Sequence, residues 1–392
     1  MANPIDFYDR FRFVIEDVHG NILARDVVAQ EVKLSRVLSS PGEINCKIHP
    51  KEPSIQHPSG SGPIRLKPWG HWIHALKYNQ FGEEIIFASG IVEASEVDPE
   101  SGILDLRAKT FSNYPKGIPW LQNWNPIAVD PFEIVDRIWK HIQSYSNAAL
   151  GVSVYPASSG TQMLPGWSFN NEQYIRDFFA IFIRAADKTD CGEYLEKLCR
   201  DIPFDYIEES GWNSDRTAIK KGIRLGYPKG GVRQEGLVFR RGENIKSAKQ
   251  KLESEIEWVS DIIIDGFFPG KTYSAQISNY DPDRFRRVVN ELDVRIDSNE
   301  RAAAWAKRKL TRRQFPYQYD TIIVDPYHPN APFGTFDVGD EILIQGKMPW
   351  LEQDIKQWHR IIAISYGDEK GDLELKVMAE GAFNYDPIMY QG

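Results

Sequence analysis

The sequence predicts an α+β protein that is mainly β, with two similar small β-barrel domains flanking a mixed α/β middle region. Three observations lead to this fold class. Short alternating strands with turn signals occupy both ends of the chain, well-capped helices lie between them, and one hairpin motif occurs twice. A chain of 392 residues is also longer than a single core usually organises. We therefore expect domains at residues 1–125, 126–315 and 316–392, with the middle region itself divided in two.

The repeated motif is a short β-hairpin near each end of the chain. Small, acidic, glycine, leucine and basic residues coincide in the two copies once a one-residue gap is allowed. The segments are, for the first copy, Ile91–Ser95, a turn to Gly102 and Leu104–Arg107, and for the second, Ile361–Ser365, Asp368–Gly371 and Leu373–Lys376. Their separation, about 270 residues, far exceeds the roughly 20 to 50 residues of solenoid and propeller repeats. The repeat predicts two copies of one β domain whose hairpins superpose.

Alternating apolar and polar residues from Phe11 to about Phe111 predict the first barrel. Turn residues at His19–Asn21 and Asn79–Gly82 separate the runs, and a Pro-, Ser- and Gly-rich stretch at 50–63 predicts a long loop. Short strands of this kind indicate a small barrel or sandwich. The predicted strands contain Arg12–Ile15, Glu31–Leu34, Ile44–Ile48, Trp72–Tyr78, Glu84–Ala94 and Ile103–Ala108.

The middle region has clear helix starts. Asp130 is placed as an N-cap before Pro131 and Glu133, and Asp190 repeats the arrangement with Glu193. A third predicted helix, from Asn299 to about Arg312, gathers basic residues at its end, where cations complement the helix dipole. Strand-like runs between the helices lie at 152–155, 222–225, 237–240 and 262–264.

The last segment, from Tyr317 to about Met378, reads as β structure again. Its predicted strands are Thr321–Val324, Glu341–Ile344, Trp358–Ser365 and Leu373–Val377. Their order matches that of the last strands of the first domain, which predicts the second barrel.

Composition excludes several classes of protein. A net charge of −8 offers no overall basic footprint for duplex nucleic acid. Three scattered cysteines are too few for a disulfide framework or a four-cysteine zinc site. The N-terminus lacks the pattern of a signal peptide, and no window approaches 18 uncharged apolar residues. We expect a chain that neither carries a signal peptide nor inserts into a membrane.

No motif predicts a catalytic, cofactor-binding or metal-binding residue. His71 and His74 are three apart in a predicted strand and so point to opposite faces. Cys191 and Cys199 are too far apart along one helix to chelate a single ion. The glycine-rich stretch 226–231 follows one strand and precedes another, so we expect a hairpin loop there rather than a phosphate site.

Trp120 and Trp124 lie with Tyr114 in a Pro-rich connector and admit two interpretations. Exposed aromatic rings there could contact a glycan. The alternative, which the usual behaviour of bulky rings favours, is that they pack the first barrel against the first helix.

The order of segments resembles the minor tail proteins of long-tailed, siphovirus-type phages of actinobacteria, in the tail hub or tail-associated baseplate hub family. The resemblance spans nearly the whole chain, although its motifs are structural rather than catalytic. The segments that carry it are Asp130–Ser144, Tyr194–Cys199, Asp283–Val288 and Arg301–Leu310, followed by the terminal barrel.

The resemblance implies a homotrimer at the distal tail tip of the virion, assembled in the host cytoplasm. In that family each subunit gives two tube-like barrels, so three chains make a pseudo-sixfold ring that closes a hexameric tail tube. It implies as partners the distal tail protein and tail tube, the tape measure protein and other tail-tip or receptor-binding proteins. DNA would pass through the lumen during genome ejection without specific binding, which an acidic wall favours.

The chain ends soon after the second predicted barrel, and we therefore expect a minimal hub without enzymatic activity or cofactor. A rival interpretation is a carbohydrate-binding or hydrolytic tail-tip protein that acts on the host surface through Trp120 and Trp124. A third is the same fold in a phage-derived injection device.

Overall fold

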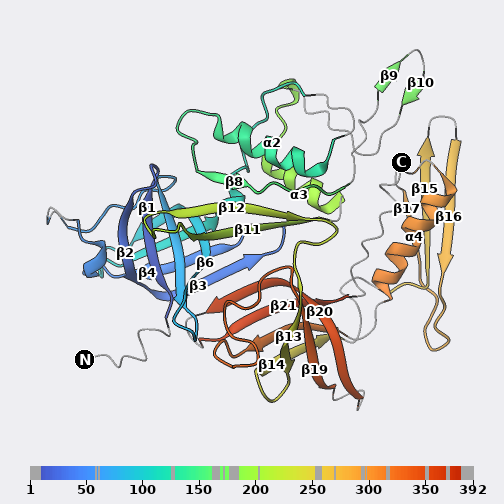
Figure 1. Ribbon diagram of the computed structural model, residues 1–392. Coiled ribbons are helices and arrows are strands. Elements are labelled where there is room, and N and C mark those ends of the chain that lie inside the picture. Colours follow the sequence, from blue (N-terminus) through green and yellow to red (C-terminus); the bar gives the residue numbers. More distant parts are fainter. Residues whose placement is uncertain are drawn as a thin grey trace.

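The computed structural model describes residues 10–57, 60, 62–124, 129–160, 168–170, 173–175, 185–201, 204–251, 258–268, 271–292, 296, 298–314, 318–348, 353–367 and 371–380. The architecture is mainly β, as predicted (Figure 1). Among the described residues, no helix is both long enough and apolar enough to cross a membrane.

The dominant feature is a 13-stranded sheet that contains strands from both ends of the chain. The N-terminal strands are β1 (Arg12–Asp17), β2 (Ile22–Val28), β3 (Gln30–Val37), β4 (Glu43–Ile48), β5 (His71–Tyr78), β6 (Glu84–Val97) and β7 (Leu104–Thr110). The later strands are β13 (Arg233–Arg240), β14 (Ile245–Lys251), β18 (Gln318–Val324), β19 (Glu341–Met348), β20 (Gln353–Gly367) and β21 (Leu373–Ala379).

The strand order joins the two ends of the chain side by side. It runs β14-β18-β21-β20-β3-β4-β7-β6-β5-β1-β2, with β19 paired to β20 and β13 paired to β19. In Figure 1 the blue N-terminal strands and the red C-terminal strands curl in adjacent bodies that meet where β3 lies beside β20. One hydrophobic cluster continues through both bodies, from Phe11 to Val377. The sequence placed β13 and β14 in the middle region, whereas they complete the C-terminal part of the sheet.

The middle region packs helices α2 (Pro131–Gln143) and α3 (Cys191–Asp201) near a second sheet. Both predicted helix starts are confirmed. The side chain of Asp130 accepts a hydrogen bond from the Phe132 N–H at 2.9 Å, and that of Asp190 accepts from Glu193 N–H at 2.9 Å. Ile134, Ile138 and Ile142 lie on the buried face of α2.

The second sheet is ordered β11-β12-β8, from β11 (Asp205–Trp212), β12 (Ile219–Gly226) and β8 (Val152–Val154). Short strands β9 (Ser168–Asn170) and β10 (Gln173–Ile175) form a separate pair. The described residues also form short 3-10 helices at η1 (Pro53–Ile55), η2 (Phe111–Asn113) and η3 (Ala185–Asp187). The glycine-rich stretch 226–231 links β12 to β13, which lie in different sheets, so it is a connector and not the predicted hairpin loop.

A small module forms its own core from β15 (Asp261–Phe268), β16 (Lys271–Ser278), β17 (Val288–Leu292) and α4 (Asn299–Arg313). It is the orange group at the right of Figure 1. Ile262 and Ile264 of the sheet share a buried cluster with Ala302 and Ala306 of the helix. At the basic end of α4, Lys309 and Arg313 both contact the carboxylate of Glu291.

Candidate assembly surface

The two repeated hairpins have the same backbone construction. In the first, β6 pairs with β7 with an irregularity between Val92 and Ala94, after which Ala94 lies opposite Arg107. In the second, β20 pairs with β21 with an irregularity between Ile361 and Ala363, after which Ala363 lies opposite Lys376. A β-bulge adds one residue to one strand and redirects the side chains that follow it. Both hairpins therefore have the bulge at the same position, and in both the bulge redirects the side chains that follow it.

The turns of the two hairpins also agree. Gly102 has φ +70° and donates its N–H to the carbonyl of Asp98 at 2.7 Å. Gly371 has φ +65° and donates its N–H to the carbonyl of Gly367 at 3.3 Å. Positive φ is costly for residues that carry a Cβ, which explains the glycine in each turn.

The structural match requires a correction to the predicted alignment. Matching letters placed Ile91 with Ile361 and needed a one-residue gap. The bulges and the cross-strand partners instead place Val92 with Ile361 and Leu104 with Leu373, without a gap. The same correspondence places Val97 with Tyr366 and Asp98 with Gly367.

The second hairpin joins the two ends of the chain at a junction that we call the seam, the pairing of β20 with β3. Residues Ala363 to Gly367 of β20 lie opposite Val37 to Lys33 of β3 in antiparallel register. The Leu38 N–H extends the pairing by donating to the carbonyl of Ile362 at 2.8 Å. The second half of β20 therefore has β21 along one edge and β3 along the other, while its first half pairs with β19.

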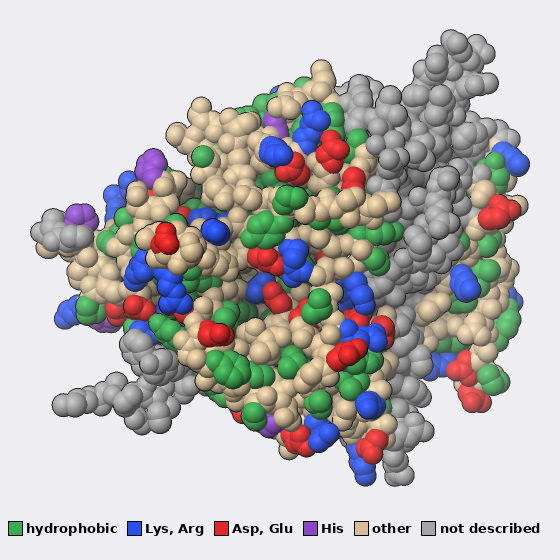
Figure 2. Space-filling view, viewed as in Figure 1, with side chains coloured by type: hydrophobic (Ala, Val, Ile, Leu, Met, Phe, Trp, Pro, Cys, Tyr) green, Lys and Arg blue, Asp and Glu red, His purple; other side chains and the backbone are tan. Residues whose placement is uncertain are grey.

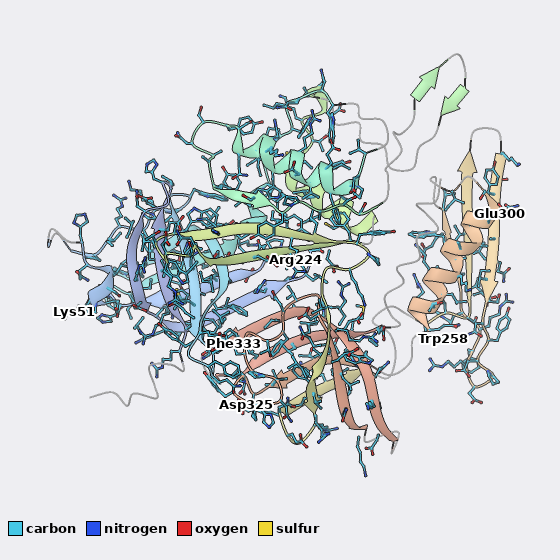
Figure 3. The ribbon with its side chains drawn as sticks, in the orientation of Figure 1. Lys51, Arg224, Trp258, Glu300, Asp325 and Phe333 are labelled. Carbon is cyan, nitrogen blue, oxygen red and sulfur yellow. The ribbon has the colours of Figure 1, made fainter. Side chains whose placement is uncertain are left out.

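Aromatic packing closes the seam on its core side. Tyr366 is 5% exposed, and its ring centroid lies 4.6 Å from that of Phe11 in an edge-on arrangement. Phe333, which follows β18, packs edge-on against Phe11 and tilted against Phe87. Figure 3 shows Phe333 where the N-terminal and C-terminal strands meet. Side chains from both halves thus share one apolar interior.

A buried ion pair and a hydrogen bond connect the seam to β11 of the middle region. The guanidinium of Arg360, on β20, contacts the carboxylate of Asp205, on β11, and both side chains are buried. Arg36 of β3 lies 2.9 Å from the carboxylate of Asp337 and donates a hydrogen bond to the Glu208 carbonyl at 2.7 Å. Burial raises the pKa of Asp205 and of Asp337, although the neighbouring arginines oppose that rise.

The β11–β12 hairpin crosses the first β domain and is held there by a buried charge cluster. Lys221 Nζ lies 2.5 Å from Glu16 Oε1, and His74 Nε2 lies 3.2 Å from Glu16 Oε2. Burial disfavours the Glu16 carboxylate, but His74 and Lys221 outweigh that cost and lower its pKa. Burial lowers the pKa of His74, which Glu16 partly opposes. Figure 2 shows cationic and anionic side chains interspersed over this region.

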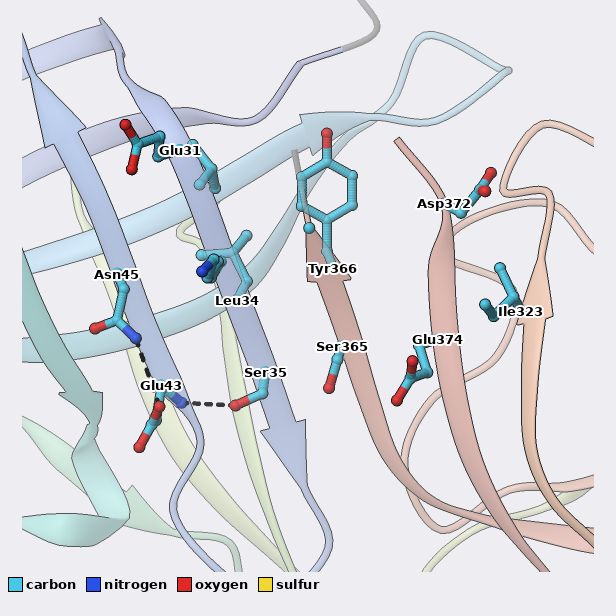
Figure 4. Close-up of a pocket in the computed structure, with 13 residues that line it drawn as sticks. Glu31, Leu34, Ser35, Glu43, Asn45, Ile323, Ser365, Tyr366, Asp372 and Glu374 are labelled. Atoms are coloured by element: carbon cyan, nitrogen blue, oxygen red, sulfur yellow. Dashed lines mark hydrogen bonds between the residues drawn. The ribbon is translucent and has the colours of Figure 1, made fainter. Parts of the chain in front are cut away.

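The polar side of the seam forms an acidic groove of about 580 Å³. Its walls come from β3 and β4 on one side and from β20, β21 and β18 on the other (Figure 4). The charged residues that line it are the carboxylates Glu31, Glu43, Asp372 and Glu374 and one cation, Lys33. Ion pairs with neighbours outside the groove partly neutralise it, from Lys47 to Glu31 at 2.7 Å and from Lys246 to Asp372 at 2.5 Å.

The structure buries both tryptophans that the sequence singled out. Trp120 is 1% exposed and Trp124 is 8% exposed, and the two rings lie 6.1 Å apart at their centroids. The guanidinium of Arg137 covers the Trp124 ring at 4.3 Å. They share a core with Phe132 and Ile138 of α2, which is the packing arrangement favoured from sequence. Glycan contact by these residues stays a prediction.

The other sequence candidates lie apart. His71 Nδ1 accepts a hydrogen bond from the Lys67 N–H at 2.9 Å, whereas His74 Nδ1 is buried 2.7 Å from the Ser89 hydroxyl. Burial raises the pKa of the Cys191 thiol to about 12, which makes it a poor nucleophile. In the described part of the chain, no group of three or more His, Cys, Asp or Glu side chains could hold a metal ion.

The chain shares its fold with proteins of phage tails. The 43 kDa tail protein of prophage MuSo2 from Shewanella oneidensis superposes with a TM-score of 0.61 at 13% identity, over 96% of this chain and 100% of that one. A tail protein from Neisseria meningitidis gives 0.55 at 10% identity, over 97% and 98%. Prophage tail protein gp18 from Listeria monocytogenes gives 0.51 at 13% identity, over 96% of each chain. The sequence itself matches no protein-family profile and no curated protein.

Proposed function

We propose that this chain is a structural hub protein of a phage tail, a component of the tail tip or baseplate. One observation carries the proposal most directly. The same hairpin, with the same bulge and turn, occurs in both halves of one continuous sheet, in a fold shared with phage tail proteins. A chain that carries one element twice can occupy two equivalent places in a ring.

The finer proposal is a homotrimer whose two similar β domains form a pseudo-sixfold ring. Three chains with two equivalent hairpins each present six equivalent positions, which adapts threefold symmetry to a hexameric tail tube. We propose that the ring closes the distal end of the tube as part of the virion, and that it is a siphovirus-type hub of the kind that the sequence resembles. The same geometry would serve a phage-derived injection device.

The acidic groove suits a wall that DNA passes during genome ejection. Carboxylates outnumber lysines four to one among the residues that line the groove, and Lys47, Lys109 and Lys246, which pair with three of them, lie outside it, so the lining itself offers phosphates little to bind. As neighbours we propose the distal tail protein and tail tube, the tape measure protein, and tip or receptor-binding proteins. We propose no enzymatic activity for the chain itself.

Mass measurement and imaging test this proposal together. Native mass spectrometry of the purified full-length chain should give three times the mass of one chain, and negative-stain images should show a ring. Immunogold labelling of the intact particle should place the protein at one end of the tail. A chain that is monomeric at all concentrations and is missing from the tail would contradict the proposal.

A further inference from the structure

The turn that leads into β5 carries an exposed tryptophan in a backbone conformation that favours glycine. Trp69 has φ +59°, and it is 54% exposed. The Gly70 N–H donates to the carbonyl of Lys67 at 3.1 Å, which closes a four-residue turn with Pro68 and Trp69 at its centre. Because proline fixes its own φ at about −65°, a positive φ at the next residue makes this a type II turn. That position is usually glycine or asparagine, and a bulky residue there is an outlier.

The second β domain has glycine at the corresponding position. Gly339 has φ +90° and donates its N–H to the carbonyl of Ile361 at 2.8 Å. Trp69 donates its N–H to the carbonyl of Val92 at 2.7 Å. Since Val92 and Ile361 are corresponding residues of the two hairpins, Trp69 occupies the place of Gly339.

The rest of the turn agrees between the two β domains. The second turn is closed by the Asp340 N–H, which donates to the carbonyl of Asp337 at 3.2 Å, as Gly70 donates to Lys67 in the first. The first β domain has one more residue, His71, before its strand reaches the position that matches the start of β19. The chain thus builds one turn twice and places tryptophan at the left-handed position only once.

The fold itself gives no reason for this tryptophan. A residue with a Cβ is strained at positive φ, and glycine would relieve that strain, as it does in the second β domain. Burial does not explain the indole either, because about half of the Trp69 side chain faces solvent. A strained residue that the surrounding structure does not need for packing indicates a function for its side chain.

A second aromatic ring and a polar pair lie beside Trp69. The ring centroid of half-buried Tyr114 is 6.3 Å from that of Trp69, at an interplanar angle of 58°. Glu93 directly follows Val92 at the bulge, and its carboxylate accepts a hydrogen bond from Asn113 Nδ2 at 2.6 Å. Both polar side chains are half-buried. The surface therefore combines a flat apolar ring with a carboxylate and an amide that have further hydrogen-bonding capacity.

We propose that Trp69 and Tyr114 form a carbohydrate-binding platform on the first β domain. A sugar ring has a face of C–H groups that packs flat on an indole, and hydroxyl groups at its rim that need hydrogen-bond partners. Trp69 offers the flat face, with Tyr114 beside it. Glu93 and Asn113 offer an acceptor and a donor for the hydroxyl groups. One exposed indole matches one sugar ring in size, whereas a stable protein partner covers roughly 800 Å² on each side.

The platform adds a ligand to the structural role proposed above, and it does not depend on ring assembly. It also differs from the tryptophans that the sequence singled out, because Trp120 and Trp124 are buried. An oligosaccharide of a bacterial surface is the class of ligand that this platform would take.

Binding of oligosaccharides by the purified full-length chain tests the proposal. An array of bacterial surface and cell-wall oligosaccharides is probed first, and the strongest ligand is then titrated by calorimetry. The wild type should bind at least one of them. Trp69→Gly should weaken that binding at least about tenfold, because it removes the stacking surface. Its midpoint of thermal unfolding should not fall by more than about 2 °C, because glycine suits this turn. An array without any bound oligosaccharide would overturn the proposal.

Three further variants separate the ring from the fold. Trp69→Asn tolerates positive φ without a large ring and should lose binding as Trp69→Gly does. Trp69→Tyr keeps an aromatic ring and should retain most of the affinity. Phe81→Ala is the control, since Phe81 is an aromatic residue of the same β domain that is 66% exposed, and it should bind as the wild type does.

Two outcomes with these variants would also overturn the proposal. One is equal binding by Trp69→Gly and the wild type. The other is a loss of binding that occurs only together with a lower unfolding temperature, since Trp69 would then act on the fold. A chain that binds sugar through Trp69 but is missing from the phage tail would refute the hub function and retain this site.

Discussion

The β6–β7 and β20–β21 hairpins share a backbone and differ in what covers them. Both have a bulge at the same step and a left-handed glycine in the turn. The side chains of the two hairpins differ where the second hairpin pairs with β3. The second hairpin has buried Ile364 and Tyr366 at the positions where the first has Ser95 and exposed Val97. Arg360, which binds Asp205, corresponds to Ile91. Turn and bulge residues thus determine the shape of the hairpin, and its neighbours determine the character of its side chains.

The two hairpins should differ most in how much stability is lost when Tyr366 or its counterpart Val97 is replaced by alanine. Tyr366→Ala should lower the free energy of unfolding by about 3 to 5 kcal/mol, because it empties a site in the shared aromatic core. Val97→Ala should change it by no more than about 0.5 kcal/mol in a dilute, monomeric sample, because the side chain is exposed. Urea unfolding followed by tryptophan fluorescence measures both. A similar loss for the two variants would contradict the difference in packing between buried Tyr366 and exposed Val97.

Breaking the buried ion pair between Arg360 and Asp205 should lower the free energy of unfolding nearly as much as Tyr366→Ala. Asp205→Ala leaves the Arg360 guanidinium buried without its carboxylate, and we expect a loss of about 3 to 5 kcal/mol in urea unfolding. The double variant Asp205→Leu with Arg360→Leu should recover much of that loss, because it removes both charges. A double variant that is no more stable than the single one would show that the charges themselves hold the seam.

Acid should weaken the second hairpin through His359, which corresponds to Gly90 in the first. Burial lowers the pKa of His359 to about 4, and its Nε2 accepts a hydrogen bond from the Tyr319 N–H at 3.1 Å. The unfolded chain then binds a proton more readily than the folded one. This histidine should therefore cost about 2 kcal/mol of stability as pH falls from 7 to about 4.5.

Urea midpoints measured across that pH range test the role of His359. The variant His359→Gln keeps a polar side chain without this ionisation and should show a shallower decline than the wild type. Identical pH profiles for the two proteins would show that His359 does not cause the loss of stability in acid.

The smallest expected effects are at the turn glycines, where the two hairpins should behave alike. Gly371→Ala should cost about 1 kcal/mol, because alanine at positive φ is strained. Gly102→Ala should cost slightly more, since a Cβ there would also lie 3.3 Å from Pro50 Cγ. Thermal unfolding of the two variants provides the comparison. A large cost at one turn and none at the other would weaken the equivalence of the hairpins.

Local features of the fold were predictable from sequence because local chemistry determines them. Asp130 and Asp190 start helices by binding N–H groups within three residues, and Gly102 and Gly371 enable turns on their own. Bulges leave no comparable signature in the letters. The alignment of Ile91 with Ile361 rested on matching letters alone, and it missed by one residue the correspondence that the cross-strand partners show.

Contacts between distant segments could not be predicted in the same way. The sequences of β3 and β20 do not predict that these strands pair. Pairing between strands that are remote in sequence depends on how the whole chain between them folds. The same reason explains why β13 and β14 were assigned to the middle region. The one signal that could have indicated the seam was the difference within the repeat, where Tyr366 is large and apolar at the position of Val97.

The two-sided pairing of β20 also has a mechanical consequence. A force that slides the halves past each other along the strands loads all the β20–β3 hydrogen bonds at once, so none can break before the others. Slippage by one residue is equally unfavourable, because it would turn Tyr366 from the core to solvent and bring polar neighbours inward. The junction between the halves is therefore a stiff joint rather than a hinge, suited to carrying load along the direction of its strands.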